Sequence, residues 1–280
     1  WVKTGADGRY SIYTIRPAPY PGETMPAHIH LSVKEPGINE YYVDELVFDD
    51  DPLLTGEKRK KLENRGGSGV LRIVLDTGMQ VGEHDIVLGL NIPGYPVPGR
   101  ATIQSGLPVG EDNPSFGPYH AFGPDKGSQA CPVCKYGRYH GILYFVGNHP
   151  DWHTIKDWLR FLEKESSERK QYLKAYFVYG NENGYGKAFR EKELECIGTE
   201  LGLKYTALTF VPSFSDQSTE VYLNRINPEV DNTIIVYRHR SIIAKFINLK
   251  PVPENFAKLK SVLDKTRNSY FQLREYSVEE

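Results

Sequence analysis

The apolar residues in the first third of the chain come in short runs that alternate with polar positions. Five runs are rich in β-branched and aromatic residues, and Gly, Pro or Asp lies between them: 8–15, 27–33, 41–48, 70–75 and 83–91. A period of two with frequent turn residues is typical of antiparallel strands. The pattern predicts an all-β domain over residues 1–92, with a β-sandwich or partial barrel as its architecture.

The hydrophobic pattern changes after Cys134. Residues 141–147 and 174–180 are continuous apolar runs of strand length, and the segment between them carries Ile155, Trp158 and Leu159 at helical spacing. Continuous runs are typical of strands buried on both faces of a parallel sheet, so we expect a βαβ unit here. The elements expected after it are a helix at 187–202, a strand at 205–211, a short helix near 220–226, a hairpin at 233–247 turning at His239, and a helix at 253–268.

Residues 93–130 separate these two patterns. Pro and Gly recur there every few residues and no hydrophobic period survives, which predicts a linker or a long segment lying on the surface. The expected organisation is therefore two domains, an antiparallel all-β sandwich at 1–92 and an α/β domain at 131–280, joined by the Pro/Gly-rich segment 93–130.

Composition excludes several classes of function. The chain of 280 residues has a formal net charge of -2 and no dense basic patch, which argues against nucleic acid or an anionic membrane as the main partner. No apolar run approaches the roughly 20 residues that span a bilayer. The N-terminus has neither an initiator Met nor a signal-peptide pattern, so we expect a processed product or a piece of a longer protein. The compartment stays open, with an extracytoplasmic location preferred.

Tyr20, His28 and His30 form the first candidate site. Alternate residues of a strand share a face, so His28 and His30 are expected to project to one side, about 7 Å apart at the backbone. A phenolate oxygen with imidazole nitrogens suits iron better than magnesium or calcium. The alternative, that both histidines are ordinary strand residues, stays open on this pattern alone.

The surrounding residues resemble a known family. The segments "DGRYSIYTIRPAPYP", "PAHIHLSV", "VFDDDPL" and "HDIVLGLN" are collinear with motifs of the intradiol ring-cleavage dioxygenases, the catechol and protocatechuate type. This resemblance implies a β-sandwich holding Fe(III) through two tyrosines and two histidines, with Tyr20, His28 and His30 as three of the four ligands. It implies a catechol-like aromatic substrate that is cleaved with O2. The family's first tyrosine ligand has no match here, so the domain is expected to be partial at its N-terminus.

Two further positions differ from that family. Met25 stands where an arginine usually precedes "P-A-H-I-H", and Glu45 stands where a glutamine often lines the substrate pocket. Glu45 is therefore carried as a candidate catalytic residue, and an ordinary catechol or protocatechuate is not the expected substrate.

Cys131 and Cys134 form the second candidate site. Three cysteines are too few for a disulfide scaffold, but a C-x-x-C spacing permits a redox disulfide or half of a zinc site. The chain after Tyr136 resembles the thioredoxin-like fold, in which the C-x-x-C follows the first strand and begins the next helix. Here the pair precedes that strand, so we expect it to lie away from a helix N-terminus. Two roles for the pair stay open: a local disulfide that holds the linker against the domain, and a weak redox switch.

Three functions compete at this stage. The leading hypothesis is a non-haem Fe(III) dioxygenase joined to a thioredoxin-like domain, which would serve for docking a protein partner. The alternatives are a non-catalytic binding protein with a degenerate sandwich and a thiol-disulfide oxidoreductase.

Overall fold

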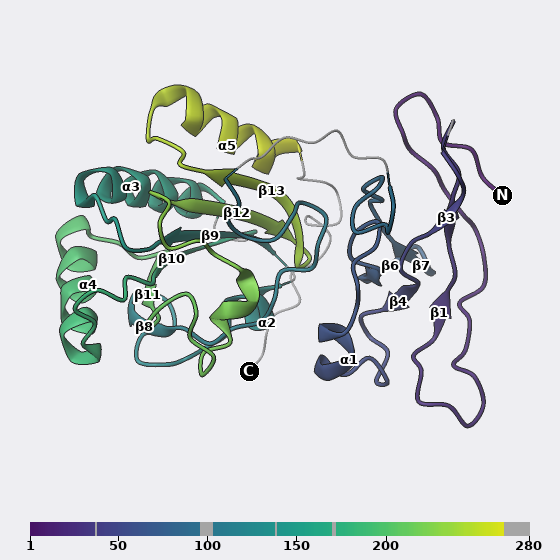
Figure 1. Ribbon diagram of the computed structural model, residues 1–280, viewed down its shortest axis with the longest axis horizontal. Coiled ribbons are helices and arrows are strands. Elements are labelled where there is room, and N and C mark those ends of the chain that lie inside the picture. The colour runs from purple at the N-terminus through teal and green to yellow at the C-terminus, as the bar shows by residue number, and fades with distance from the viewer. Residues whose placement is uncertain (37, 96–102, 138, 170–171, 266–280) are drawn as a thin grey trace. The chain divides into compact units, whose positions relative to one another are not determined.

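The computed structural model describes residues 1–36, 38–95, 103–137, 139–169 and 172–265. Within them the chain forms two compact units (Figure 1). The first consists of residues 1–63 and 69–84, and the second of residues 64–68 with the described residues from 85 onward.

The first unit is built from very short strands. Its elements are β1 (His28–Ile29), β2 (Ser32–Val33), β3 (Tyr41–Tyr42), β4 (Leu46–Phe48), α1 (Gly56–Lys60), β5 (Val70–Leu71), β6 (Ile73–Asp76) and β7 (Met79–Gly82). In the described residues these strands form a three-stranded sheet in the order β1-β4-β5 and the separate pairs β2-β3 and β6-β7. A small apolar cluster of Ala27, Leu46, Phe48 and Leu71 lies at its centre.

Two of the expected strands are not formed. Residues 8–15 have no strand, and Ile12, Tyr13 and Ile15 are exposed, so this run has no apolar surface to pack on. Residues 83–91 are irregular because their backbone bonds to a turn instead of to a strand: Val87 N–H donates to Gly66 O, and Leu90 O accepts from Gly66 N–H, both at 2.8 Å. The β content of the first unit is confirmed, whereas a two-sheet sandwich stays a prediction.

The second unit is a mixed α/β domain. Its strands are β8 (Tyr119–Phe122), β9 (His140–Val146), β10 (Leu173–Tyr179), β11 (Thr206–Phe210), β12 (Thr233–Arg238) and β13 (Ser241–Ile247). Its helices are α2 (Pro132–Tyr136), α3 (Trp152–Glu168), α4 (Lys187–Leu201), α5 (Pro253–Lys265) and the 3₁₀ turn η1 (Val221–Asn224). The described strands form a six-stranded sheet in the order β13-β12-β9-β10-β11-β8.

The expected βαβ unit is confirmed at the centre of this sheet. Strands β9, β10 and β11 are parallel, while β8, β12 and β13 run antiparallel to their neighbours. Every residue of β9 is buried, as the continuous apolar run predicts. The hairpin β12-β13 turns at His239 and Arg240, both with positive φ. The order of strands and helices resembles that of a thioredoxin-like fold.

Apolar clusters cover both faces of the sheet. One face packs against α3, α4 and α5, with Trp158, Leu194 and Leu259 fully buried between helices and strands. The other face packs against α2, η1 and the segment around Phe116. Alternate residues of β9 serve the two clusters: Ile142 and Tyr144 belong to the first, Leu143 and Phe145 to the second.

The segment before the C-x-x-C belongs to this domain. Residues 110–113 lie along β13, where Gly110 N–H donates to Ile242 O at 2.7 Å and Ile242 N–H donates to Glu111 O at 2.9 Å. At the opposite edge β8 pairs with β11. The described part of this segment from residue 103 onward contributes Leu107, Phe116 and Ala121 to the core, and it adds a strand that the pattern did not predict.

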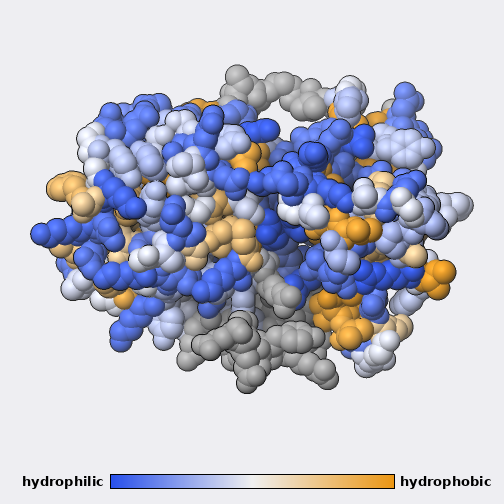
Figure 2. Space-filling view, turned by 90° about the horizontal axis from the view of Figure 1, so that it is seen from below, coloured by the Kyte–Doolittle hydropathy of each residue, from blue (hydrophilic) through white to orange (hydrophobic). Residues whose placement is uncertain are grey.

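The surface of the molecule is mainly hydrophilic in the view of Figure 2, with separate apolar patches. Among the described residues, no helix combines the length and apolar character that a bilayer crossing requires.

Candidate redox site

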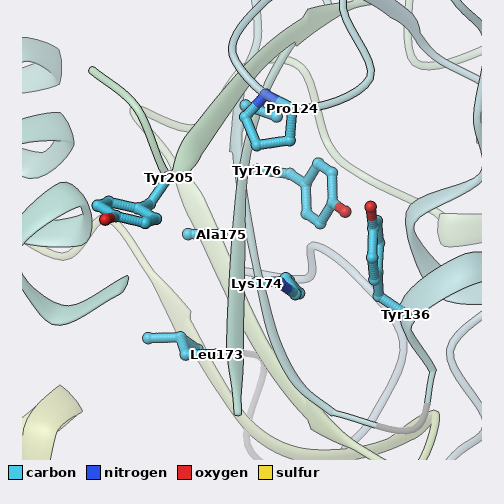
Figure 3. Close-up of a pocket in the computed structure, with 8 residues that line it drawn as sticks. Pro124, Tyr136, Leu173, Lys174, Ala175, Tyr176 and Tyr205 are labelled. Carbon is cyan, nitrogen blue, oxygen red and sulfur yellow. The ribbon is translucent and has the colours of Figure 1, made fainter. Parts of the chain in front are cut away.

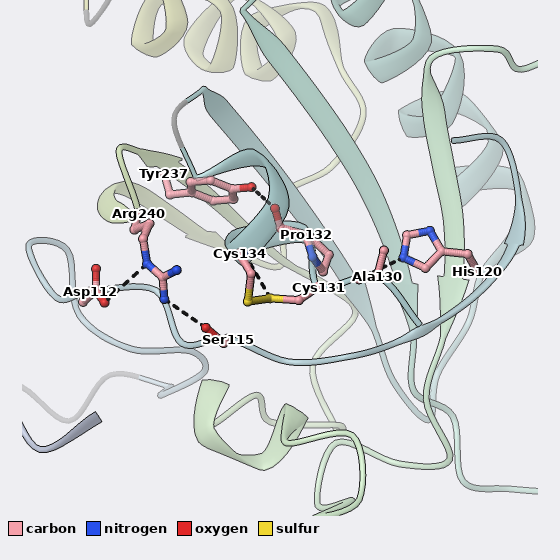
Figure 4. Close-up of a disulfide and its surroundings, with 9 residues drawn as sticks. All are labelled: Asp112, Ser115, His120, Ala130, Cys131, Pro132, Cys134, Tyr237 and Arg240. Carbon is pink, nitrogen blue, oxygen red and sulfur yellow. Dashed lines mark hydrogen bonds and ion pairs between the residues drawn. A yellow bond between two sulfur atoms is a disulfide. The ribbon is translucent and has the colours of Figure 1, made fainter. Parts of the chain in front are cut away.

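Cys131 and Cys134 are joined by a disulfide at the start of α2 (Figure 4). Cys131 is the residue that caps this helix, with an extended backbone, and its Sγ accepts the N–H of Cys134 at 3.0 Å. Pro132 follows at the first helical position, where its fixed φ and missing N–H are tolerated. The expectation that the pair lies away from a helix N-terminus is wrong, because a short helix forms within the C-x-x-C segment itself.

The two cysteines differ in exposure. Cys134 is exposed, whereas Cys131 is half-buried and packs against the apolar cluster on this face of the sheet. Cys196, which lies in α4, is a free cysteine and is exposed. Attack on the disulfide from solvent is therefore easier at the sulfur of Cys134 than at that of Cys131.

Neighbouring elements hold this helix against the sheet. Val133 is fully buried, and the hydroxyl of Tyr237 on β12 donates to Pro132 O at 3.4 Å. His120 on β8 lies 2.8 Å through Nε2 from Ala130 O, immediately before Cys131, and 3.1 Å through Nδ1 from Pro124 O. Because carbonyl oxygens only accept, a neutral His120 ring donates to one of them and an imidazolium to both.

A small cavity of about 50 Å³ opens beside α2 (Figure 3). Its polar lining consists of Lys174 and Tyr176 from β10, Tyr136 from α2 and Tyr205 before β11. Burial lowers the pKa of Lys174 and raises the pKa values of Tyr136 and Tyr176. Burial at this cavity therefore disfavours the charged form of each group relative to the same group in water.

In the thioredoxin family the dithiol follows the first strand of the βαβ unit. In this chain the corresponding loop, directly after β9, contains a polar network. The Nδ2 of Asn148 donates to Glu229 Oε1 at 2.7 Å, and His149 Nε2 lies 2.9 Å from Glu229 Oε2. These two hydrogen bonds lower the pKa of Glu229. Asp151 then caps α3 by accepting the N–H of His153. This loop positions the helix and carries no thiol.

The candidate metal ligands of the first unit lie close together. The ring centroids of Tyr20 and His28 are 5.3 Å apart, and those of His28 and His30 are 4.8 Å apart. Pro26 O lies 2.8 Å from His28 Nδ1, and Glu45 Oε1 lies 3.5 Å from His30 Nδ1. Both histidine contacts occupy a ring nitrogen that a metal could otherwise use.

The fit to a metal ion is incomplete. Tyr20 is 52% exposed, and within the described parts of the chain no three His, Cys, Asp or Glu side chains are placed to hold an ion. The assignment of Fe(III) to Tyr20, His28 and His30, and a catalytic role for Glu45, stay predictions.

Sequence reasoning missed the cavity beside α2 and the anchoring role of His120. His120 lies within the segment interpreted as a linker, where no pattern marked it. Lys174 did carry a signal, since it is the charged residue of an otherwise apolar strand run.

Comparisons with known proteins give a likeness of fold. No family model matches the chain, and no curated protein matches it. A thioredoxin domain of a thiol-disulfide oxidoreductase from Bacteroides vulgatus is similar at 14% identity and TM-score 0.39, covering 55% of this chain and 97% of that one. A thiol peroxidase from Chromobacterium violaceum is similar at 12% identity and TM-score 0.40, covering 58% and 90%. The exposed lipoprotein thioredoxin Etrx1 of Streptococcus pneumoniae is similar at 15% identity and TM-score 0.38, covering 54% and 98%.

The prediction of an Fe(III) ring-cleavage dioxygenase acting on a catechol-like aromatic with O2 is wrong. Neither a dioxygenase family model nor a curated dioxygenase matches the chain. The motif resemblance failed because short turn and His-x-His patterns can recur without the surrounding strands, and residues 1–27 form none.

Proposed function

We propose that this chain is a thiol-disulfide redox protein whose reactive pair is Cys131 and Cys134. One observation carries the proposal. The exposed Cys134 is bonded to a half-buried Cys131 whose sulfur already accepts a backbone N–H. The first feature gives an incoming thiolate access, and the second stabilises the sulfur that must leave as an anion.

The exchange proceeds in two balanced steps. An incoming thiolate attacks Sγ of Cys134, the bond between the two cysteine sulfurs breaks, and its electron pair goes to Sγ of Cys131. A second thiolate of the reductant then attacks the mixed disulfide, releases Cys134 as a thiolate and leaves the reductant as a disulfide. Both cysteine thiolates take protons from solvent as their pKa values dictate. The chain gains two electrons, and the reverse sequence oxidises a substrate dithiol.

The residues around the pair fix its position during this cycle. Val133 anchors α2 in the apolar cluster, and the Tyr237 hydroxyl donates to Pro132 O. The hydrogen bond from Cys134 N–H remains available to Cys131 Sγ after the disulfide opens. Because this donor belongs to the same helix, the leaving sulfur needs no movement of a second element to be stabilised.

The first test measures how readily the pair is reduced. The Cys196→Ser protein is equilibrated in dithiothreitol buffers of known potential, alkylated, and weighed by mass spectrometry. We expect reversible reduction at a potential above about -300 mV, the region of labile and catalytic disulfides. A pair that stays oxidised at lower potentials would be a structural staple, and the proposal would be wrong.

The second test identifies the attacked sulfur. Cys131→Ser and Cys134→Ser, both in the Cys196→Ser background, are mixed with oxidised glutathione. The remaining Cys134 should form the mixed disulfide at least about tenfold faster than the remaining Cys131, because it is the exposed thiol. Equal rates would contradict the assignment of Cys134 as the entry point.

A further inference from the structure

We propose that the cavity beside α2 is a carboxylate-binding subsite, formed by the ammonium of Lys174 and the hydroxyls of Tyr176 and Tyr136. The inference rests on the proposed redox function for its meaning: the carboxylate belongs to a thiol or disulfide compound that reacts at Cys134. The substrate class is therefore a thiol carrying an acid group a few bonds from its sulfur.

Lys174 supplies a positive charge that forms no ion pair among the residues that the structure describes. Its Nζ lies 5.2 Å from the ring centroid of Tyr136 and 5.4 Å from that of Tyr139. Across the stretches that the structure describes, no carboxylate oxygen lies within 4.0 Å of this nitrogen. Two aromatic faces stabilise an ammonium more weakly than a carboxylate does, so the half-buried charge retains capacity for an anion.

The other charges near Lys174 are those of Asp125 and Lys135, and Oδ2 of Asp125 has no hydrogen-bond partner in the described residues. Asp125 attracts Lys174 electrostatically and Lys135 repels it. These two residues form an ion pair with each other, 2.6 Å between Lys135 Nζ and Asp125 Oδ1. Because that pair is close to neutral, the charge it leaves for a ligand in the cavity is that of Lys174.

Tyr176 gives the second, independent observation. Its side chain is only 2% exposed, yet it lines the cavity, and in the described residues its hydroxyl has no hydrogen-bond partner. The hydroxyl oxygen is not among the fully buried unsatisfied atoms, so it opens to the cavity, where it can donate to a ligand or to water. Figure 3 shows the hydroxyl of Tyr176 directed towards that of Tyr136, on the same side of β10 as Lys174.

Size and position narrow the ligand. A cavity of about 50 Å³ takes one carboxylate or one to two waters, so it recognises a group and not a whole molecule. Tyr136 lies two residues after Cys134 on the same helix. A rise of about 1.5 Å per residue keeps the subsite within reach of a short ligand whose sulfur is at Cys134. A small mercapto acid and an acidic residue next to cysteine in a peptide share this chemistry.

The binding experiment uses the full oxidised chain and no thiol. Backbone amide signals are followed by NMR during titration with propionate, and with propionamide as the uncharged probe. Propionate should shift the signals of Lys174 and Tyr136, and Lys174→Gln should weaken its binding at least about tenfold. Lys164→Gln, an exposed lysine on α3, is the matched control. Tyr176→Phe keeps the ring and should weaken binding about threefold or more.

The kinetic experiment identifies the source of the carboxylate. Rates of disulfide reduction are compared for 3-mercaptopropionate against 2-mercaptoethanol, and for the blocked peptides Cys-Glu against Cys-Gln. In each pair the ratio of acidic to neutral rate should fall about tenfold in Lys174→Gln. The compound pair in which this rate ratio falls identifies the source of the carboxylate as a small mercapto acid or a peptide.

The outcomes separate the two proposals. If propionate binding depends on Lys174, the subsite is supported. If in addition no thiol reduces the disulfide, the redox function is overturned while the subsite stands. Reduction by neutral thiols with no Lys174-dependent propionate binding overturns the subsite alone. Equal effects of Lys174→Gln and Lys164→Gln also overturn the subsite, since they would reflect net charge.

Discussion

The burial of His140 makes the stability of the second unit depend on pH. This residue begins β9 with 2% of its surface exposed. Burial lowers the pKa of the imidazole from 6.5 to about 4, with the positive charges of Arg238 and Arg169 adding to the effect. As the pH falls, His140 therefore becomes protonated near pH 6.5 in the unfolded chain and only near pH 4 in the folded chain. Stability is complete above pH 6.5 and is lost as the pH falls towards 4.

The size of the effect follows from the two pKa values. Proton linkage with pKa values of about 6.5 and about 4 gives a loss of roughly 0.2 kcal/mol at pH 7 and about 2 kcal/mol at pH 5. Lowering the pH from 7 to 5 should thus cost about 2 kcal/mol of unfolding free energy through this one side chain.

The assay is urea unfolding at both pH values, followed by tryptophan fluorescence. Trp152 and Trp158 lie on α3 and Trp1 is fully exposed, so the change in signal on unfolding reports on the second unit. His140→Gln should lose about 2 kcal/mol less than the wild type between pH 7 and pH 5. His153→Gln, whose side chain is 88% exposed, should follow the wild type. If His140→Gln and the wild type differ in pH dependence by less than about 0.5 kcal/mol, burial of the imidazole is not the cause.

Two further changes test how the sheet is packed, with the same unfolding assay. A Cβ added at Gly141 would overlap the ring of Tyr237, so Gly141→Ala should destabilise the unit by about 1–3 kcal/mol. Gly186→Ala, whose nearest neighbouring atom is 3.8 Å away, is its control, and equal losses would contradict the clash. Glu163 accepts backbone N–H groups from Lys204, Tyr205 and Thr206, so Glu163→Gln, which keeps one acceptor oxygen, should cost about 1–2 kcal/mol. An unchanged unfolding midpoint in Glu163→Gln would show that these bonds add nothing.

The sequence predicted the second unit well because burial there is periodic and local. The apolar run at 141–147 is β9, the helical spacing of Ile155, Trp158 and Leu159 is α3, and the turn at His239 is where the hairpin reverses. A strand buried on both faces allows few polar positions, so such a run has little alternative to the centre of a sheet.

The sequence predicted the rest poorly because tertiary contacts decide it. β8 is four residues among glycines and prolines, and it becomes a strand because β11 is available to pair with it. The run at 8–15 alternates as a strand should, yet it pairs with no strand among the described residues. The same holds for the candidate site. The C-x-x-C motif was visible in the sequence, whereas the position of its helix and the neighbouring cavity depend on contacts with β10 and β12.

Residues that precede Cys131 lie at both edges of the six-stranded sheet. On one side β8 pairs with β11, and on the other the segment 110–113 bonds to β13. A fragment that begins at Cys131 would keep the helices and the dithiol but would lose β8 and the segment 110–113. The backbone groups of β11 and β13 that bond to them would then be unpaired, and unpaired strand edges promote association between copies. Recombinant chains for the redox and binding work should therefore begin before Ser105, so that the thiols are measured in an intact sheet.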